Sequence, residues 1–163
     1  MKPDDLLLLL QDFYRDKLAL YRRHEAGARL VSGYDANNTY QYILAREDTH
    51  LEWLRRALTD LGAQPDDTGA APAVPPLGKG KGAARALFED DARMAGEFVA
   101  RWRERVAKAT HAPHRKMLEL TVGETAEHQR FFEQAVAGRV DLLGRRPDTQ
   151  GTGGGVMPTR WVE

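Results

Sequence analysis

The sequence predicts an all-α protein, a bundle of four helices with one long crossover connection between the second and third. Apolar residues recur with helical periodicity in four segments, and runs of alternating Val, Ile and Thr that would indicate strands are nearly absent. A single long stretch rich in Pro and Gly divides the four segments into two pairs. The 163 residues are enough for one compact domain with a sizeable core.

The first pair of helices is predicted over residues 3–29 or 3–31 and over residues 38–61. Gly33 is suited to cap the C-terminal end of the first helix, and Asn38 is suited to begin the second with a capping box. The turn that joins them, residues 34–38, is short, so the two helices should pack antiparallel.

A long connection separates this pair from the second. Residues 63–82 read AQPDDTGAAPAVPPLGKGKG, and at roughly 3 Å per residue they can run the length of a bundle. Such a crossover lets the third helix lie parallel to the second. The last two helices are predicted over residues 83–110 and 113–137, with Pro113 in the first turn of the fourth helix and Gly138 as its cap.

The composition excludes several classes of protein and of site. Lys and Arg total 24, as do Asp and Glu, so the formal net charge is zero and we expect no nucleic-acid partner. There is no cysteine, so any metal ligands must be His and carboxylate side chains. The longest apolar run, Leu6–Leu10, is far shorter than a membrane span and follows no basic segment. We therefore expect no membrane partner, no signal peptide and a cytoplasmic location.

Each predicted apolar stripe is interrupted by acidic or histidine residues. Counting about 1.5 Å of rise per residue from the two short turns brings these positions level, near the middle of the bundle. Several ionised carboxylates in a core repel one another and lose hydration, which becomes favourable if cations lie among them. Without thiolates, such ligands suit iron, manganese or zinc. The candidate metal ligands are Glu25, Glu47, His50, Glu97, Glu124, Glu127 and His128.

The pattern of these residues resembles the ferritin-like superfamily, which includes ferritins, bacterioferritins and rubrerythrins. Its members have a Glu on the first and third helices, Glu-x-x-His on the second, and Glu-x-x-His or Glu-x-x-Glu on the fourth. Here the second helix has Glu47-Asp-Thr-His50. The fourth has Glu124-Thr-Ala-Glu127, followed directly by His128.

The resemblance covers residues 3–138 and leaves two ligands open, His24 or Glu25 on the first helix and Asp91 or Glu97 on the third. It implies a site for two iron ions per bundle, with manganese or zinc as other metals. The implied activity is that of a di-iron oxidoreductase, either iron oxidation or reduction of peroxide or oxygen. The alternative is a metal-free or degenerate bundle, whose inward acids pair with Lys or Arg and which acts as a structural or interaction protein.

Residues 139–163 are predicted to form a Gly-rich C-terminal tail, which leaves residues 1–138 as the bundle domain. A Gly-rich spacer followed by the apolar octamer VMPTRWVE is typical of a docking segment. It either docks on a partner or neighbouring subunit, folds back on its own bundle, or stays disordered. Exposed apolar stripes favour a homodimer, to which Trp102, Phe131 and Phe132 are candidate contributors.

Overall fold

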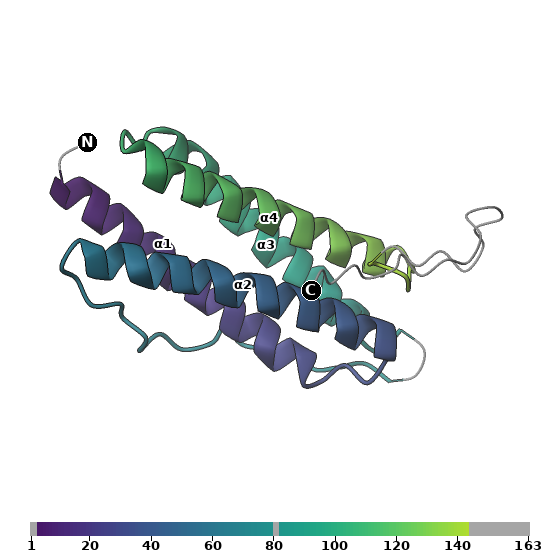
Figure 1. The fold of residues 1–163 in the computed structure, drawn as a ribbon. Helices are drawn as coiled ribbons and strands as arrows, with labels where there is room; N and C mark the ends of the chain where they lie inside the picture. Colours follow the sequence, from purple (N-terminus) through teal and green to yellow (C-terminus); the bar gives the residue numbers. More distant parts are fainter. Residues whose placement is uncertain (1–2, 80–81, 144–163) are drawn as a thin grey trace, which may run out of the picture.

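The computed structural model describes residues 3–79 and 82–143, and its helices run lengthwise beside one another (Figure 1). They are α1 (Pro3–Ala28), α2 (Tyr34–Asp60), α3 (Arg85–Ala107) and α4 (Ala112–Val136). The described residues contain no strand. The prediction of an all-α four-helix bundle is confirmed.

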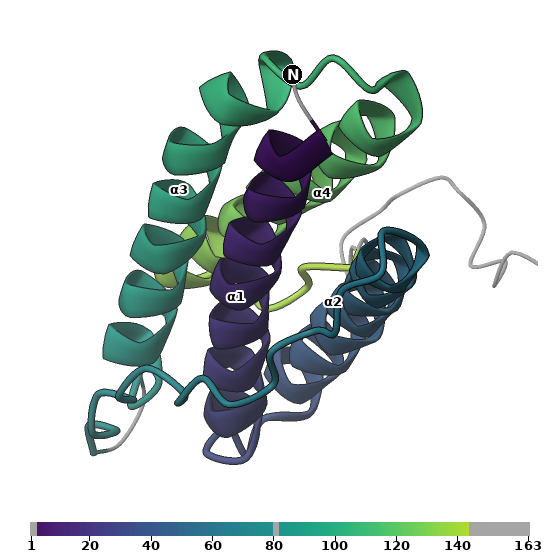
Figure 2. The same cartoon turned by 90° about the vertical axis from the view of Figure 1, so that its left-hand side faces the viewer.

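The long connection sets the order of the helices in space. α1 and α2 pack antiparallel, as do α3 and α4, and the connection after α2 runs back along the bundle, so α3 points in the same direction as α2 (Figure 1). α1 also packs against α3, and α2 against α4, which leaves α2 and α3 on one diagonal of the bundle (Figure 2). The predicted crossover is therefore confirmed. Within the described residues, no helix combines the length and apolar character needed to cross a membrane.

The predicted start of α2 at Asn38 is wrong by four residues. The helix begins at Tyr34, with Gly33 as its N-cap in an extended conformation and without a side-chain capping bond. The polar run contacts the preceding helix instead, because Asn37 Nδ2 donates to the carbonyl oxygen of Ala28 at 3.3 Å. This bond satisfies a carbonyl at the end of α1. The short turn therefore lies before Tyr34, and Gly33 does not cap α1.

Two glycines end helices as predicted. Gly62 and Gly138 have φ values of 77° and 91°, in the left-handed region that favours glycine. After α2, the amide of Ala63 donates to the carbonyl oxygen of Leu58 at 2.9 Å, which is the long bond of a Schellman cap. Pro113 lies in the first turn of α4, also as predicted. α3 is shorter than predicted at both ends.

The crossover is attached to the bundle near its start. The Tyr14 hydroxyl on α1 donates to Asp67 Oδ1, and Arg22 Nη2 donates to the carbonyl oxygen of Asp67 at 2.5 Å. The guanidinium of Arg55 on α2 lies 5.6 Å from the centre of the Tyr14 ring. Burial and Asp67 raise the pKa of Tyr14 to about 12, so this hydroxyl keeps its proton at neutral pH. Because Arg55 Nη2 also lies 3.5 Å from Asp67 Oδ1, these contacts hold the crossover against both α1 and α2.

The core consists of two apolar clusters with a polar layer between them. The larger cluster includes the first half of α1 and the end of α3, and the smaller one contains Tyr40, Leu87 and Phe132. Trp102 and Phe132 are buried inside the bundle, with exposed fractions of 0% and 1%. They cannot contribute to a dimer interface, which corrects that part of the prediction. Phe131 is half-buried.

Candidate functional site

The polar layer is centred on Glu47, which is fully buried on α2. Its Oε1 lies 2.7 Å from Nζ of Lys17, and its Oε2 lies 2.8 Å from Nδ1 of His24, both on α1. Lys17 and His24 are seven residues apart, about two helical turns, which puts them on one face of α1. Nδ1 of His128 on α4 lies 3.8 Å from Glu47 Oε1. Two other helices, α1 and α4, thus bring side chains to this one buried carboxylate.

The Lys17 ammonium is enclosed by partners from three other helices. Besides Glu47, it donates to Thr125 Oγ1 at 3.0 Å and lies 5.3 Å from the centre of the Phe98 ring. The Thr125 hydroxyl in turn donates to the carbonyl oxygen of Thr121 at 2.8 Å, so both its donor and its acceptor functions are used. Lys17 therefore joins α1 to α2, α3 and α4 at the middle of the bundle.

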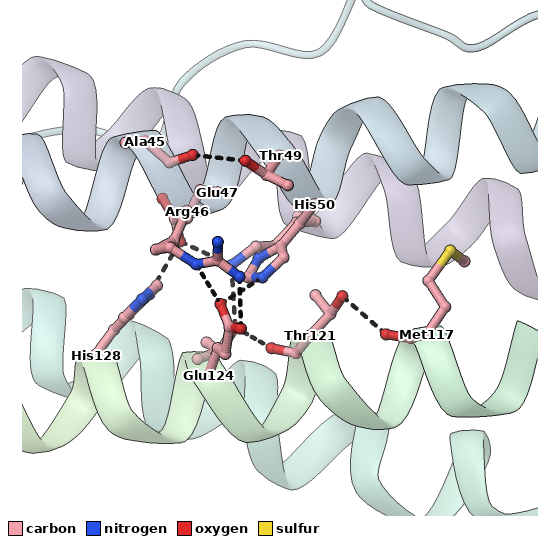
Figure 3. Close-up of polar contacts among 11 residues, drawn as sticks. Ala45, Arg46, Glu47, Thr49, His50, Met117, Thr121, Glu124 and His128 are labelled. Atoms are coloured by element: carbon pink, nitrogen blue, oxygen red, sulfur yellow. Dashed lines mark hydrogen bonds and ion pairs between the residues drawn. The ribbon is translucent and has the colours of Figure 1, made fainter. Parts of the chain in front are cut away.

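A second ion pair closes the seam between α2 and α4 (Figure 3). Arg46 donates from Nε and Nη2 to the two carboxylate oxygens of Glu124, at 2.9 and 2.7 Å. His50 Nε2 lies 2.8 Å from Glu124 Oε2. Burial would raise the pKa of Glu124, but Arg46 and His50 lower it, so the carboxylate is ionised. Glu124 is thus neutralised by a side chain of the same protein.

A third group of charges lies toward the smaller apolar cluster. Nη2 of the fully buried Arg23 is 3.0 Å from Asp90 Oδ2 and 3.2 Å from Asp91 Oδ1. The hydroxyl of Tyr40 donates to Asp91 Oδ2. Burial raises the pKa of Asp91, while His24, Tyr40 and Arg23 act against that increase. The inward acid of α3 therefore also has a basic partner.

Burial and these partners decide the protonation of the layer. Burial alone would raise the pKa of Glu47, but His24 and Lys17 hold it well below its usual value, so the side chain is an anion at neutral pH. Burial lowers the pKa of His50 to about 4, and Lys17 acts in the same direction. Burial also lowers the pKa of His128, although Glu47 opposes the decrease. Both imidazoles are therefore neutral at neutral pH.

The structure separates the seven candidate ligands into two sets. Glu25 is half-buried and Glu97 is exposed, and both pair along their own helices, with Arg29 at 2.9 Å and with Arg93 at 2.7 Å. Glu127 is exposed on α4. The expected convergence on the middle of the bundle does not extend to these three. The four that lie in or beside the polar layer are Glu47, His50, Glu124 and His128.

Of the alternatives left open by the sequence, the inward residues are His24 on α1 and Asp91 on α3, both fully buried. Sequence reasoning missed Lys17 and Thr125 as members of the layer. Two signals were present. Lys17 lies on the same helical stripe as His24, and Thr125 lies three residues before His128, where side chains share a face.

The helix arrangement matches a known fold. No protein-family model and no curated protein matches the chain. Among solved structures, the bacterioferritin of Rhodobacter capsulatus matches with a TM-score of 0.66, covering 90% of this chain and 98% of that one at 15% sequence identity. This chain has the ferritin-like fold. The bacterioferritin is described with a metal-free dinuclear site and a haem iron. At this identity the likeness concerns the fold, and the ligands must be judged from this chain's own residues.

A dinuclear ferritin-like site takes one Glu from each of two helices and a Glu-x-x-His pair from each of the other two. In this ferritin-like chain α2 has the complete pair, Glu47 and His50. On α4 the residue three before His128 is Thr125, so that pair lacks its carboxylate. The side chain that α1 brings against Glu47 and Thr125 is the cation Lys17.

Each inward carboxylate also has a basic partner already. No group of three or more His, Asp and Glu side chains among residues 3–79 and 82–143 is arranged to hold a metal ion. The residues present therefore do not fit a dinuclear carboxylate centre. The three ion pairs that occupy the layer are Lys17–Glu47, Arg46–Glu124 and Arg23–Asp91.

Proposed function

We propose that this protein is a ferritin-like bundle that works without a dinuclear metal centre, as a structural or interaction protein. The observation that supports it is the buried Lys17 ammonium, 2.7 Å from Glu47 Oε1 and 3.0 Å from Thr125 Oγ1. An ammonium at this position neutralises an inward carboxylate, as a metal ion would. It offers neither a change of oxidation state nor an open coordination position for oxygen or peroxide.

The charge balance of the layer supports the same proposal. Its three inward carboxylates are matched by one Lys and two Arg side chains within 2.7–3.2 Å. Two added divalent ions would lie beside these fixed cations, and like charges in a medium of low dielectric constant repel strongly. Metal binding would therefore require Lys17 and Arg46 to leave their partners.

The second candidate is the iron-dependent function, a dinuclear iron site that oxidises iron or reduces peroxide or oxygen. One observation favours it. His24 Nε2, His50 Nδ1 and His128 Nδ1 are buried and have no hydrogen-bond partner among the described residues. Imidazole nitrogens are common ligands of iron, manganese and zinc.

Metal analysis separates the two candidates. The purified protein is incubated with ferrous iron, manganese or zinc, freed of unbound metal, and analysed for metal content beside His50→Ala and the control Glu25→Ala, which lies outside the polar layer. We expect well below one ion per chain for the parent protein and no change in either variant. Bound iron that is lost in His50→Ala and retained in Glu25→Ala, together with oxygen consumption on iron addition, would favour the second candidate.

We further propose that the protein is cytoplasmic and that it forms a homodimer. The exposed apolar stripes expected from the sequence favour the dimer. Light scattering of the purified protein tests the assembly, and a monodisperse monomer would contradict it. Cell fractionation tests the location.

A further inference from the structure

An apolar groove lies between α2 and α4, beyond the Arg46–Glu124 pair. It has a volume of about 630 Å³, within the range of about 300–1,000 Å³ that is typical of binding pockets. Figure 3 shows Met117 extending from α4 toward α2 on the side of His50 where this groove lies. Leu120, on the same helix, is 49% exposed. The lining residues are Trp53, Pro113, Lys116, Met117, Glu119 and Leu120.

The described chain leaves the bundle on the same side as the groove. After α4, residues 140–143 line one hollow together with Asn38 and Thr39 in the first turns of α2, and Leu142 is buried there. Fourteen residues of helix, about 21 Å, separate Thr39 from Trp53. The sequence that follows Leu143 therefore starts about 21 Å from the groove, along α2.

The length of that following sequence matches this span. Residues 144–155 include five glycines, and Gly-rich chains of twelve residues have a root-mean-square end-to-end distance of about 19 Å. A linker whose extension matches the distance to a site gives the highest effective concentration there. A linker of this length therefore brings the apolar octamer, residues 156–163, to the groove. These eight residues lie outside the described part of the chain.

We propose that residues 156–163 dock in the α2–α4 groove of their own chain. The octamer supplies Trp161 as an aromatic anchor for a groove lined by Met117 and Leu120, and aromatic rings make favourable contacts with methionine sulfur. Both surfaces also carry charges of each sign. The groove carries one cation, Lys116, and one anion, Glu119, and the octamer carries Arg160 and Glu163. This surface is separate from the polar layer, so the proposal does not depend on whether metal binds.

Disulfide trapping tests the proposal, because the chain has no cysteine of its own. Thr159→Cys is combined with Leu120→Cys in the groove or with Glu97→Cys as the control. Glu97 is exposed on α3, about 18 Å along that helix from Arg85. Arg85 is the residue that lies at the end of the bundle where α4 ends. We expect the groove pair to form its intramolecular disulfide about tenfold faster than the control pair, or more.

Adding Trp161→Gly to the groove pair should slow its cross-linking to the control rate, because the anchor is lost. Circular dichroism verifies that each variant keeps its helices. A fluorescent label on Leu120→Cys alone, quenched by a nearby indole, gives a second measure that should brighten in Trp161→Phe. Equal rates for the groove and control pairs, or cross-linked dimers in place of cross-linked monomers in dilute solution, would overturn docking within the same chain.

Discussion

Replacing Lys17 by Met removes the central positive charge while keeping a flexible side chain of similar length. Glu47 is then a buried carboxylate that retains the contact with His24 Nδ1 at 2.8 Å and loses the one with Nζ at 2.7 Å. Breaking a buried ion pair in this way typically costs about 3–5 kcal/mol, and we expect the lower end because His24 remains. For a chain of this size, about 3 kcal/mol corresponds to a decrease of roughly 6–12 °C in the melting temperature.

The pH dependence gives this prediction a sign. In the folded parent protein the pKa of Glu47 lies well below the ordinary value of about 4.3. The ionised Glu47 side chain therefore contributes its full stabilisation above about pH 4.3, and this stabilisation is lost only as the pH falls below about 4.3. Without Lys17 the pKa of Glu47 rises, and protonation relieves the unpaired charge. The stability difference between the parent and Lys17→Met should therefore shrink as the pH falls from 7.5 to 5.

Urea unfolding followed by circular dichroism measures these differences, with Glu47→Gln and the double variant beside Lys17→Met. When both charges are removed, the cost should largely disappear, because replacing a whole buried pair is often close to neutral. The reasoning would be refuted if Lys17→Met lowered the free energy of unfolding by less than about 1 kcal/mol. It would also be refuted if the losses of the two single variants simply added in the double variant, since a strongly coupled pair shows neither result.

Three further predictions concern other parts of the bundle. The pKa of His50 is about 4 in the folded protein and near 6.5 in the unfolded chain, so the free energy of unfolding should fall by roughly 3 kcal/mol as the pH drops from 6.5 to 4. The variant His50→Gln should lack this part of the pH dependence when unfolding by urea is measured. Tyr40→Phe removes the hydroxyl that donates to the buried Asp91 and should cost about 1–3 kcal/mol in thermal unfolding. Asp67→Ala should lower the pKa of Tyr14 from about 12 in an ultraviolet titration and speed hydrogen exchange of the crossover, with little loss of global stability.

Local patterns in the sequence were enough to predict the four helices and the crossover. Apolar periodicity and Pro/Gly breaks depend on neighbouring residues alone, so they need no knowledge of the tertiary structure. The start of α2 was different, since Gly33 and Asn38 both suit an N-cap. In the structure Asn37 bonds to Ala28 of another helix, a contact that a single segment does not reveal.

The height of the candidate site was also predictable, whereas the direction of each side chain was not. Rise per residue brings His24 and Glu25 to the same level, but adjacent residues point about 100° apart. Which one faces inward depends on the rotation of α1, and that is set by packing along its whole stripe. The same ambiguity separates Glu127, which is exposed, from His128, which is buried.

Two differences from the ferritin-like ligand pattern lie in contact with each other and explain how the layer keeps its carboxylates buried. At residue 125, Thr in place of Glu removes one negative charge, and Lys17, 3.0 Å away, adds one positive charge. Together these two differences make the local charge more positive, and His24, the inward residue of α1 where the pattern has Glu, removes a further negative charge. The remaining inward acid of α2, Glu47, is then neutralised at 2.7 Å by a covalently attached cation. A polar layer that is neutral through its own side chains can stay buried without metal, because the repulsion that metal ions relieve in a carboxylate cluster is already absent.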